Sequence, residues 1–157
     1  MVKRAEMKDI PELMRLLVQV NDVHACGRPD LFRWNATKYT QEELEALLAD
    51  ETRPVFVFPA ENGILGYAFC VWEDHRADHN QVDRRTLYLD DLCVDEAARG
   101  RGVGKALYEH VRAYAKENGA YNLTLNVWSL NQSAAGFYEA MGMKPYKVGM
   151  EAILAER

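Results

Sequence analysis

Apolar residues recur at helical spacing in four stretches of the chain, and capping signals flank these stretches. The first begins with a predicted capping box of Asp9 and Glu12, and the second with one of Thr40 and Glu43. Gly142 is a typical stop signal after the fourth. The predicted helices cover residues 9–20, 40–48, 103–118 and 131–141.

Between these stretches, apolar and β-branched or aromatic residues form shorter runs that predict strands. Glu61-Asn62-Gly63 separates two of the runs and is typical of a hairpin turn. The predicted strands cover residues 2–5, 55–58, 64–72, 87–94 and 121–127. Residues 143–154 are expected to supply the last strands, interrupted by Pro145 and Gly149.

The order of these elements predicts the fold class. Three strands run as an antiparallel meander up to residue 94, and a helix then crosses over to the strand at 121–127. A helical crossover makes the two strands that it joins parallel. We therefore expect an α/β protein of the α+β type, with a mixed, mostly antiparallel central sheet flanked by helices.

The sequence allows two interpretations for each of two connecting segments. Residues 21–38 contain His24, Phe32 and Trp34, and these rings either form a binding wall or close the edge of the core. Residues 73–85 are strongly charged and contain His75 and His79. Because no apolar helix presents these two histidines on one face, a solvated hairpin loop is favoured over a metal site.

Composition narrows the class of protein. The 157 residues predict a single domain, residues 1–157, and the net charge of −5 argues against a nucleic-acid partner. The three cysteines, Cys26, Cys70 and Cys93, show neither metal-ligand nor disulfide spacing, which favours the reducing cytoplasm. No apolar run reaches membrane-spanning length, and the charged N-terminal segment is unlike a signal peptide.

A glycine-rich turn joins the strand at 87–94 to the helix at 103–118. The first turn of a helix offers unpaired N–H groups and a favourable dipole to an anion, and glycine lets the anion approach the backbone. Basic side chains add positive charge beside this predicted anion cradle. The turn reads Arg99-Gly100-Arg101-Gly102-Val103-Gly104-Lys105.

The spacing within the turn excludes two nucleotide-binding patterns. A P-loop requires Ser or Thr after Gly104-Lys105, where this chain has Ala106. A dinucleotide fingerprint requires a third glycine at position 105 or 107, where this chain has Lys105 and Leu107. What remains is Arg99-x-x-Gly102-x-Gly104, which resembles the Gln/Arg-x-x-Gly-x-Gly/Ala signature of the GNAT superfamily of acyl-CoA-dependent N-acyltransferases.

A second stretch resembles the same family in the expected order. It contains Asn131, Ala134, Phe137, Tyr138 and Gly142, and it departs from the signature where Met143 replaces an aromatic residue. The resemblance implies the GNAT fold, in which the two parallel strands splay apart and form the cofactor slot. It also implies acetyl-CoA as co-substrate, no metal, and a homodimer, which is common among similar proteins.

The resemblance also implies which residues hold the co-substrate. The amides of residues 101–105 would bind the pyrophosphate, and the backbone of Leu92, Cys93 and Val94 would pair with the pantetheine arm. The amide of Cys93 or of Val94 is then the candidate donor to the developing oxyanion. Asn131 would hydrogen-bond the pantetheine or cap its helix. The cofactor-binding residues are therefore expected among Leu92, Cys93, Val94, Arg99, Gly100, Arg101, Gly102, Val103, Gly104, Lys105, Asn131, Ala134 and Tyr138.

Acyl transfer to an amine also needs groups that move protons. An alkyl ammonium of pKa about 10.4 is almost entirely charged at neutral pH, so a base lowers the barrier. Asp90 and Asp91 interrupt the apolar strand, and by resemblance Asp90 stands at the position of the base, with Asp91 as the alternate. Tyr138 is by resemblance the acid that protonates the departing thiolate. We expect Cys93 to be inert, because no histidine is placed beside it as a base.

The predicted function is therefore acetyl transfer from acetyl-CoA to a primary amine by direct attack in a ternary complex. The acidic residues before the slot favour a small, cationic, polyamine-like amine. Within the same class, a protein N-terminal or lysine acetyltransferase is the alternative. An acyl-CoA-binding sensor without turnover is the alternative from another class.

Overall fold

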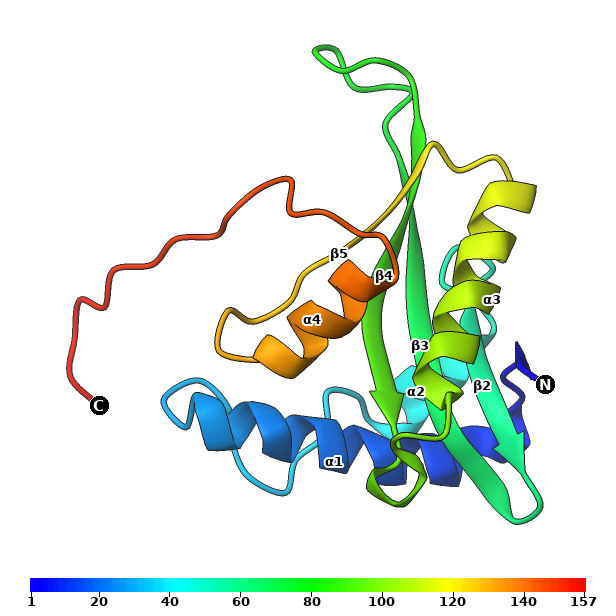
Figure 1. Ribbon diagram of the computed structural model, residues 1–157, viewed down its shortest axis with the longest axis vertical. Coiled ribbons are helices and arrows are strands. Elements are labelled where there is room, and N and C mark those ends of the chain that lie inside the picture. Colours follow the sequence, from blue (N-terminus) through cyan, green and yellow to red (C-terminus); the bar gives the residue numbers. More distant parts are fainter.

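A computed structural model describes residues 1–157 and contains one five-stranded sheet in the order β1-β2-β3-β4-β5 (Figure 1). Neighbouring strands are antiparallel from β1 to β4, while β4 and β5 are parallel. This confirms the mixed sheet and its single parallel pair. The strands are β1 (Lys3–Arg4), β2 (Val55–Ala60), β3 (Gly63–Asp74), β4 (Arg85–Val94) and β5 (Asn122–Leu125).

Helices cover both faces of the sheet (Figure 1). On one face, α1 (Ile10–Gly27) and α2 (Gln41–Leu48) enclose an apolar core with Val57, Tyr67 and Phe69. On the other face, α3 (Val103–Glu117) encloses a second core, against which α4 (Gln132–Ala140) packs Phe137 and Tyr138. Two short 3₁₀ helices, η1 (Met7–Asp9) and η2 (Glu96–Ala98), precede α1 and α3.

The capping box at Thr40 and Glu43 is confirmed, whereas the one at Asp9 and Glu12 is wrong. Oδ2 of Asp9 accepts from the Glu6 amide at 2.8 Å, so the box lies one turn earlier and caps η1. Glu12 instead pairs with Arg15. The charged side chain of an arginine one turn away competes for the carboxylate that the cap would use.

α1 is also longer than predicted and continues to Gly27. Its apolar face continues beyond Val20 as far as Ala25, which is completely buried. Small and aromatic residues on this part of the face weaken the sequence pattern without ending the helix. The aromatic residue His24 therefore projects from a helix, not from a loop.

β4 contains a bulge at Asp90. Asp91 pairs with Phe69 and Leu89 pairs with Cys70, so Asp90 has no partner on β3. A bulge of this kind interrupts the alternation of side chains between the two faces of a sheet. Asp90 and Asp91 consequently lie on the same face, the one covered by α1 and α2, as their contacts with Tyr39 and Tyr67 show.

β4 and β5 separate immediately after their last pair. The parallel ladder runs from Thr86 and Asn122 to Leu89 and Leu125. β4 then continues to Val94, paired with β3 but no longer with β5. β5 is thus shorter than the predicted strand at 121–127. The backbone of β4 from Asp90 onward has a free edge on the side of β5.

The predicted last strands at 143–154 are wrong for a single chain. The amide of Met143 makes the last backbone hydrogen bond, to Tyr138 O, and residues 144–157 form no helix or strand. They run along the outside of the molecule as an extended tail (Figure 1). A strand needs a partner edge, and the course of the tail brings none within reach.

Candidate active site

The turn that enters α3 leaves its amides without partners in the protein. Gly102 is the N-cap of α3, and no side chain caps this end of the helix. The amides of residues 100–105 donate no hydrogen bond to the protein, and the first donor is Ala106, which bonds Gly102 O at 3.0 Å. Six consecutive N–H groups at a helix N-terminus are therefore available to an anion.

The space beside two glycines of the same turn is empty. Gly100 and Gly102 have positive φ angles of 76° and 81°, which favour glycine, and a Cβ at either position would meet no atom within 4 Å. The side chains of Arg99, Arg101 and Lys105 are exposed around the opening. Space, free amides and positive charge together fit the diphosphate of a large co-substrate.

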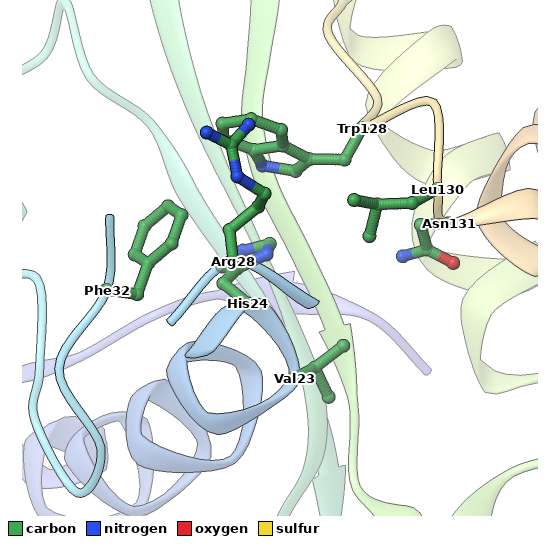
Figure 2. Close-up of a pocket in the computed structure, with 7 residues that line it drawn as sticks. All are labelled: Val23, His24, Arg28, Phe32, Trp128, Leu130 and Asn131. Carbon is green, nitrogen blue, oxygen red and sulfur yellow. The ribbon is translucent and has the colours of Figure 1, made fainter. Parts of the chain in front are cut away.

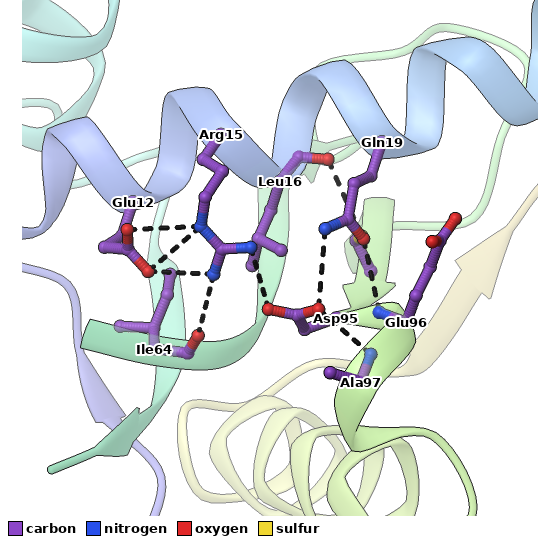
Figure 3. Close-up of polar contacts among 9 residues, drawn as sticks. Glu12, Arg15, Leu16, Gln19, Ile64, Asp95, Glu96 and Ala97 are labelled. Atoms are coloured by element: carbon purple, nitrogen blue, oxygen red, sulfur yellow. Dashed lines mark hydrogen bonds and ion pairs between the residues drawn. The ribbon is translucent and has the colours of Figure 1, made fainter. Parts of the chain in front are cut away.

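A polar network from α1 holds residues 95–97, which lie just before this turn (Figure 3). Nη1 of Arg15 lies 2.8 Å from Oδ2 of Asp95, and Asp95 Oδ1 accepts from the Ala97 amide at 3.1 Å. Gln19 contacts Asp95 with its amide nitrogen and accepts from the Glu96 amide at 3.2 Å. Asp95 thereby ties the end of β4 and the start of η2 to α1.

The unpaired edge of β4 presents specific amides to the gap. Asp95 N donates to Leu65 O on β3, and antiparallel strands alternate bonded and outward-facing residues. Cys93 therefore directs its amide toward β3, whereas Leu92 and Val94 direct theirs toward the gap beside β5. Of the two candidate oxyanion donors, the alternation favours Val94.

The thiol of Cys93 faces away from the gap. Its Sγ lies 3.7 Å from Leu16 O on α1, and burial raises its pKa to about 12. A buried thiol with a raised pKa is a poor nucleophile. The geometry agrees with the expectation that Cys93 is an inert packing residue.

The two aspartates at the bulge have different partners. Asp90 Oδ2 lies 2.7 Å from Nζ of Lys38 and 3.4 Å from the Tyr39 hydroxyl. Asp91 Oδ2 accepts from the Tyr67 hydroxyl at 2.7 Å. Burial raises the pKa of Asp91 to about 6, against the effect of the Tyr67 hydrogen bond and aided by the charge of Asp90.

Tyr138 stands on the opposite face of the sheet. Asn131 is the N-cap of α4, and its side chain accepts from the Ala134 amide at 3.1 Å. The helix carries Tyr138 against Tyr108 and Phe137. The Tyr138 hydroxyl donates no hydrogen bond to the protein. Burial raises the pKa of Tyr138, and the charge of Asp91 adds to this effect.

α4 also lies beside the cradle. A Cβ on Gly104 would lie 3.6 Å from Cζ of Phe137 and 3.4 Å from Cγ2 of Val94. The predicted co-substrate residues of the turn, of β4 and of α4 are therefore neighbours around one gap.

On the α1 side, a small pocket opens beside Trp128 (Figure 2). The rings of His24 and Phe32 lie 5.0 Å apart, and Phe32 meets Trp128 edge-on at 5.7 Å. Of the aromatics in segment 21–38, His24 and Phe32 line this wall, whereas Trp34 is 59% exposed and lies outside it. The lining residues are Val23, His24, Arg28, Phe32, Trp128, Leu130 and Asn131.

The sequence analysis did not identify Lys38, Tyr39 or Tyr67 as site residues. Lys38 and Tyr39, from the segment before α2, reach Asp90, and Tyr67 on β3 reaches Asp91; no local pattern marks such contacts. The polar hydroxyl of Tyr67 in an otherwise apolar strand was the only available signal.

The comparisons with known proteins agree with this geometry. Residues 17–143, more than half of the chain, match the model of a family described as the acetyltransferase (GNAT) family. The chain belongs to the GNAT acetyltransferase family. GNAT acetyltransferases use acetyl-CoA as co-substrate, and the free amides and open glycines of the turn fit it.

Curated relatives match this member of the GNAT family over short stretches. The peptidyl-lysine N-acetyltransferase YjaB of Salmonella typhimurium is 42% identical over 57 residues, 36% of each chain. The streptothricin acetyltransferase of Streptomyces lavendulae is 38% identical over 56 residues, 36% of this chain and 30% of that protein. The alignments thus span about a third of the length of these relatives.

Solved structures match this member of the GNAT family over nearly its whole length. A mutant of protein BH1408 from Bacillus halodurans is 31% identical with a TM-score of 0.92, and the alignment covers 99% of each chain. The aminoglycoside acetyltransferase meta-AAC0020 from an uncultured soil metagenomic sample has a TM-score of 0.74 at 21% identity, covering 99% of this chain and 96% of that one. The second likeness shows a shared fold. In this member of the GNAT family, no helix has the length and apolar character needed to cross a membrane.

Proposed function

We propose that this protein transfers the acetyl group of acetyl-CoA to a primary amine by direct attack in a ternary complex. The observation that carries the proposal is the row of unpartnered amides at residues 100–105, which opens beside the gap between β4 and β5. The pyrophosphate binds these amides, with Arg99, Arg101 and Lys105 around it. Acetyl-CoA supplies a thioester as the activated acyl donor.

The free edge of β4 holds the pantetheine arm. Leu92 and Val94 face the gap with their amides and carbonyls, so the arm completes the ladder that β5 leaves unfinished. The Val94 amide donates to the developing oxyanion. Ala134 lies at the first turn of α4, and Asn131 keeps its capping hydrogen bond while it borders the arm.

The proposed base and the proposed acid lie on opposite faces of the sheet. Asp91 on the α1 side accepts the proton that the neutral amine's nitrogen loses as it bonds to the thioester carbonyl carbon, directly or through water, because its pKa of about 6 leaves it mostly ionised at neutral pH. Asp90, already paired with Lys38, is the weaker candidate for the base. Tyr138 on the α4 side donates its proton to the departing thiolate, and its unpartnered hydroxyl supports this role.

The acceptor we propose is a small cationic amine. The aromatic faces of His24, Phe32 and Trp128 suit an ammonium or its apolar chain. A lysine side chain has the same chemistry at its end, and the name of the relative YjaB supports this second candidate. A cytoplasmic location stays a prediction.

The test is release of free thiol from acetyl-CoA across a panel of acceptors. We expect release with a linear diamine and none with its fully quaternised analogue, which matches the charge but has no N–H. Preferential release with a lysine-containing peptide would favour the second candidate. Binding of coenzyme A without turnover on any amine would contradict transfer and favour a sensor.

A further inference from the structure

Lys38 holds its primary ammonium against the bulge of β4. Its Nζ lies 2.7 Å from Oδ2 of Asp90 and 5.5 Å from the centre of the Tyr39 ring. A carboxylate and the face of an aromatic ring both attract an alkyl ammonium. The structure therefore contains a formed ammonium subsite, and a side chain of the protein itself occupies it.

The other members of this subsite are fixed by the surrounding structure. The Tyr39 ring stacks on Phe69 of β3 with a centroid distance of 5.8 Å, and its hydroxyl accepts from Nη2 of Arg53 at 3.1 Å. The same hydroxyl donates to Oδ2 of Asp90 at 3.4 Å, and the Asp90 side chain is only 16% exposed. Asp90 and Tyr39 are therefore preorganised to bind an ammonium, whichever molecule supplies it.

Lys38 is the member of the subsite that is held least. It belongs to residues 28–40, which form neither helix nor strand, and its side chain is 53% exposed. An ion pair with an exposed partner is weak, because holding a long side chain in one geometry costs conformational entropy. A second ammonium from solution can therefore displace Lys38 from Asp90 without disturbing the sheet.

The ammonium of Lys38 stays charged at neutral pH. Burial acts to lower its pKa, but the hydrogen bond and the charge of Asp90 outweigh burial and raise this pKa above its usual value. A protonated amine has no lone pair with which to attack a thioester. Lys38 is therefore suited to compete with a cationic acceptor for Asp90, not to accept the acetyl group itself.

We propose that Lys38 is a specificity-determining residue, an internal competitor that a cationic acceptor displaces from Asp90. This inference rests on the proposed function and adds a requirement to it. An amine that replaces Lys38 at Asp90 is protonated and unreactive for the same reason as Lys38, so the acceptor needs a second amine that reacts. The bulge places Asp91, the proposed base, beside Asp90 on the same face of the sheet. A linear diamine meets both requirements.

The test is binding of a linear diamine to the protein loaded with coenzyme A, measured by titration calorimetry. Coenzyme A carries no acetyl group, so no transfer takes place during the measurement. We expect Lys38→Met to bind the diamine about fivefold more tightly than the wild type, because a weak ion pair no longer competes for Asp90. Lys38→Arg keeps a cation at Asp90 and should bind like the wild type. A linear diol of the same length should distinguish none of these proteins.

Two further variants separate competition at Asp90 from a general effect of charge. In an Asp90→Asn background, Lys38→Met should leave diamine affinity unchanged. Lys8→Met removes the same charge in η1, where Lys8 is 68% exposed and pairs with Glu6, and it should bind like the wild type. Equal affinity for coenzyme A in all variants would show that each is folded.

Several outcomes would overturn the role of Lys38. These are equal diamine affinity in Lys38→Met and the wild type, no diamine binding in either, and an equal gain with and without Asp90. The proposed function fails in a different measurement, because absence of turnover with acetyl-CoA on every amine would contradict acetyl transfer. Diamine binding in the presence of coenzyme A does not depend on that result.

Discussion

The hydroxyl of Tyr67 donates a hydrogen bond of 2.7 Å to Oδ2 of Asp91. Tyr67 is completely buried on β3, and Asp91 follows the bulge of β4 at the point where β4 parts from β5. The hydrogen bond favours the ionised carboxylate, while burial favours the protonated one. The balance leaves a carboxyl group with a pKa of about 6 beside the gap where acyl transfer is proposed.

This balance predicts the pH profile of kcat/KM with an alkylamine acceptor. Above pH 6 the rate should rise with the fraction of neutral amine, and below about pH 6 the slope of its logarithm should steepen as Asp91 also takes up a proton. Tyr67→Phe removes the hydrogen bond to the carboxylate, so the steepening should move to higher pH. Initial rates measured at constant ionic strength between pH 5 and about 9 test this.

Two further variants assign the break in the profile to one aspartate. Asp91→Asn should remove the break and lower the rate, whereas Asp90→Asn should keep it. A break that disappears with Asp90→Asn and survives Asp91→Asn would assign the base to Asp90.

Tyr138→Phe should lower turnover by about 100-fold or more, because the thiolate then leaves without a proton donor. Affinity for coenzyme A, measured by titration calorimetry, should be nearly unchanged. Tyr121→Phe is the matched control, since this tyrosine is 78% exposed and lies before β5, away from α4. Unchanged turnover in Tyr138→Phe would exclude its role as the acid.

Gly102→Asp should abolish binding of coenzyme A by placing a charged side chain where the phosphates approach the amides. The variant also strains the backbone, because Gly102 has a φ of 81°, and this costs about 1 kcal/mol of folding free energy. Gly119→Asp is a close control: it has the same φ and gains the same charge, at the other end of α3. Similar melting temperatures with binding lost only in Gly102→Asp would locate the cradle; equal binding in both variants would show that it is misplaced.

Asp95→Asn should loosen the turn that carries the cradle. Burial acts to raise the pKa of Asp95, but the Ala97 amide and Arg15 outweigh it and hold this pKa below its usual range. Because folding lowers the pKa, the stabilisation is present above pH 4 and is lost as pH falls through the folded-state value. We expect a loss of about 1 kcal/mol at neutral pH, since Arg15 is partly exposed and screened by solvent.

Thermal unfolding from neutral to acidic pH checks this prediction. The difference in melting temperature between Asp95→Asn and the wild type should shrink at low pH. Glu51→Gln is the control, because Glu51 is 88% exposed and its ion pair with Arg4 is long, at 3.5 Å. An acid-independent difference would mean that the charge of Asp95 is not what stabilises the turn.

The sequence by itself determined the order of the main helices and strands up to α4, the parallel pair and the turn at residues 99–105. These features depend on local signals: apolar periodicity, closely spaced glycines, and a crossover long enough to make two strands parallel. The local signature also predicts Tyr138 as the acid, and this role stays a prediction.

Only the tertiary structure decided how the two aspartates differ. The bulge at Asp90 places both on one face, and Lys38 and Tyr67, from a loop and from a neighbouring strand, then give them different partners. The fate of residues 143–157 was likewise undecided, because their alternation predicts a strand but does not say which edge it joins. Strand pairing and burial depend on residues far apart in the chain, so a local sequence pattern does not predict them.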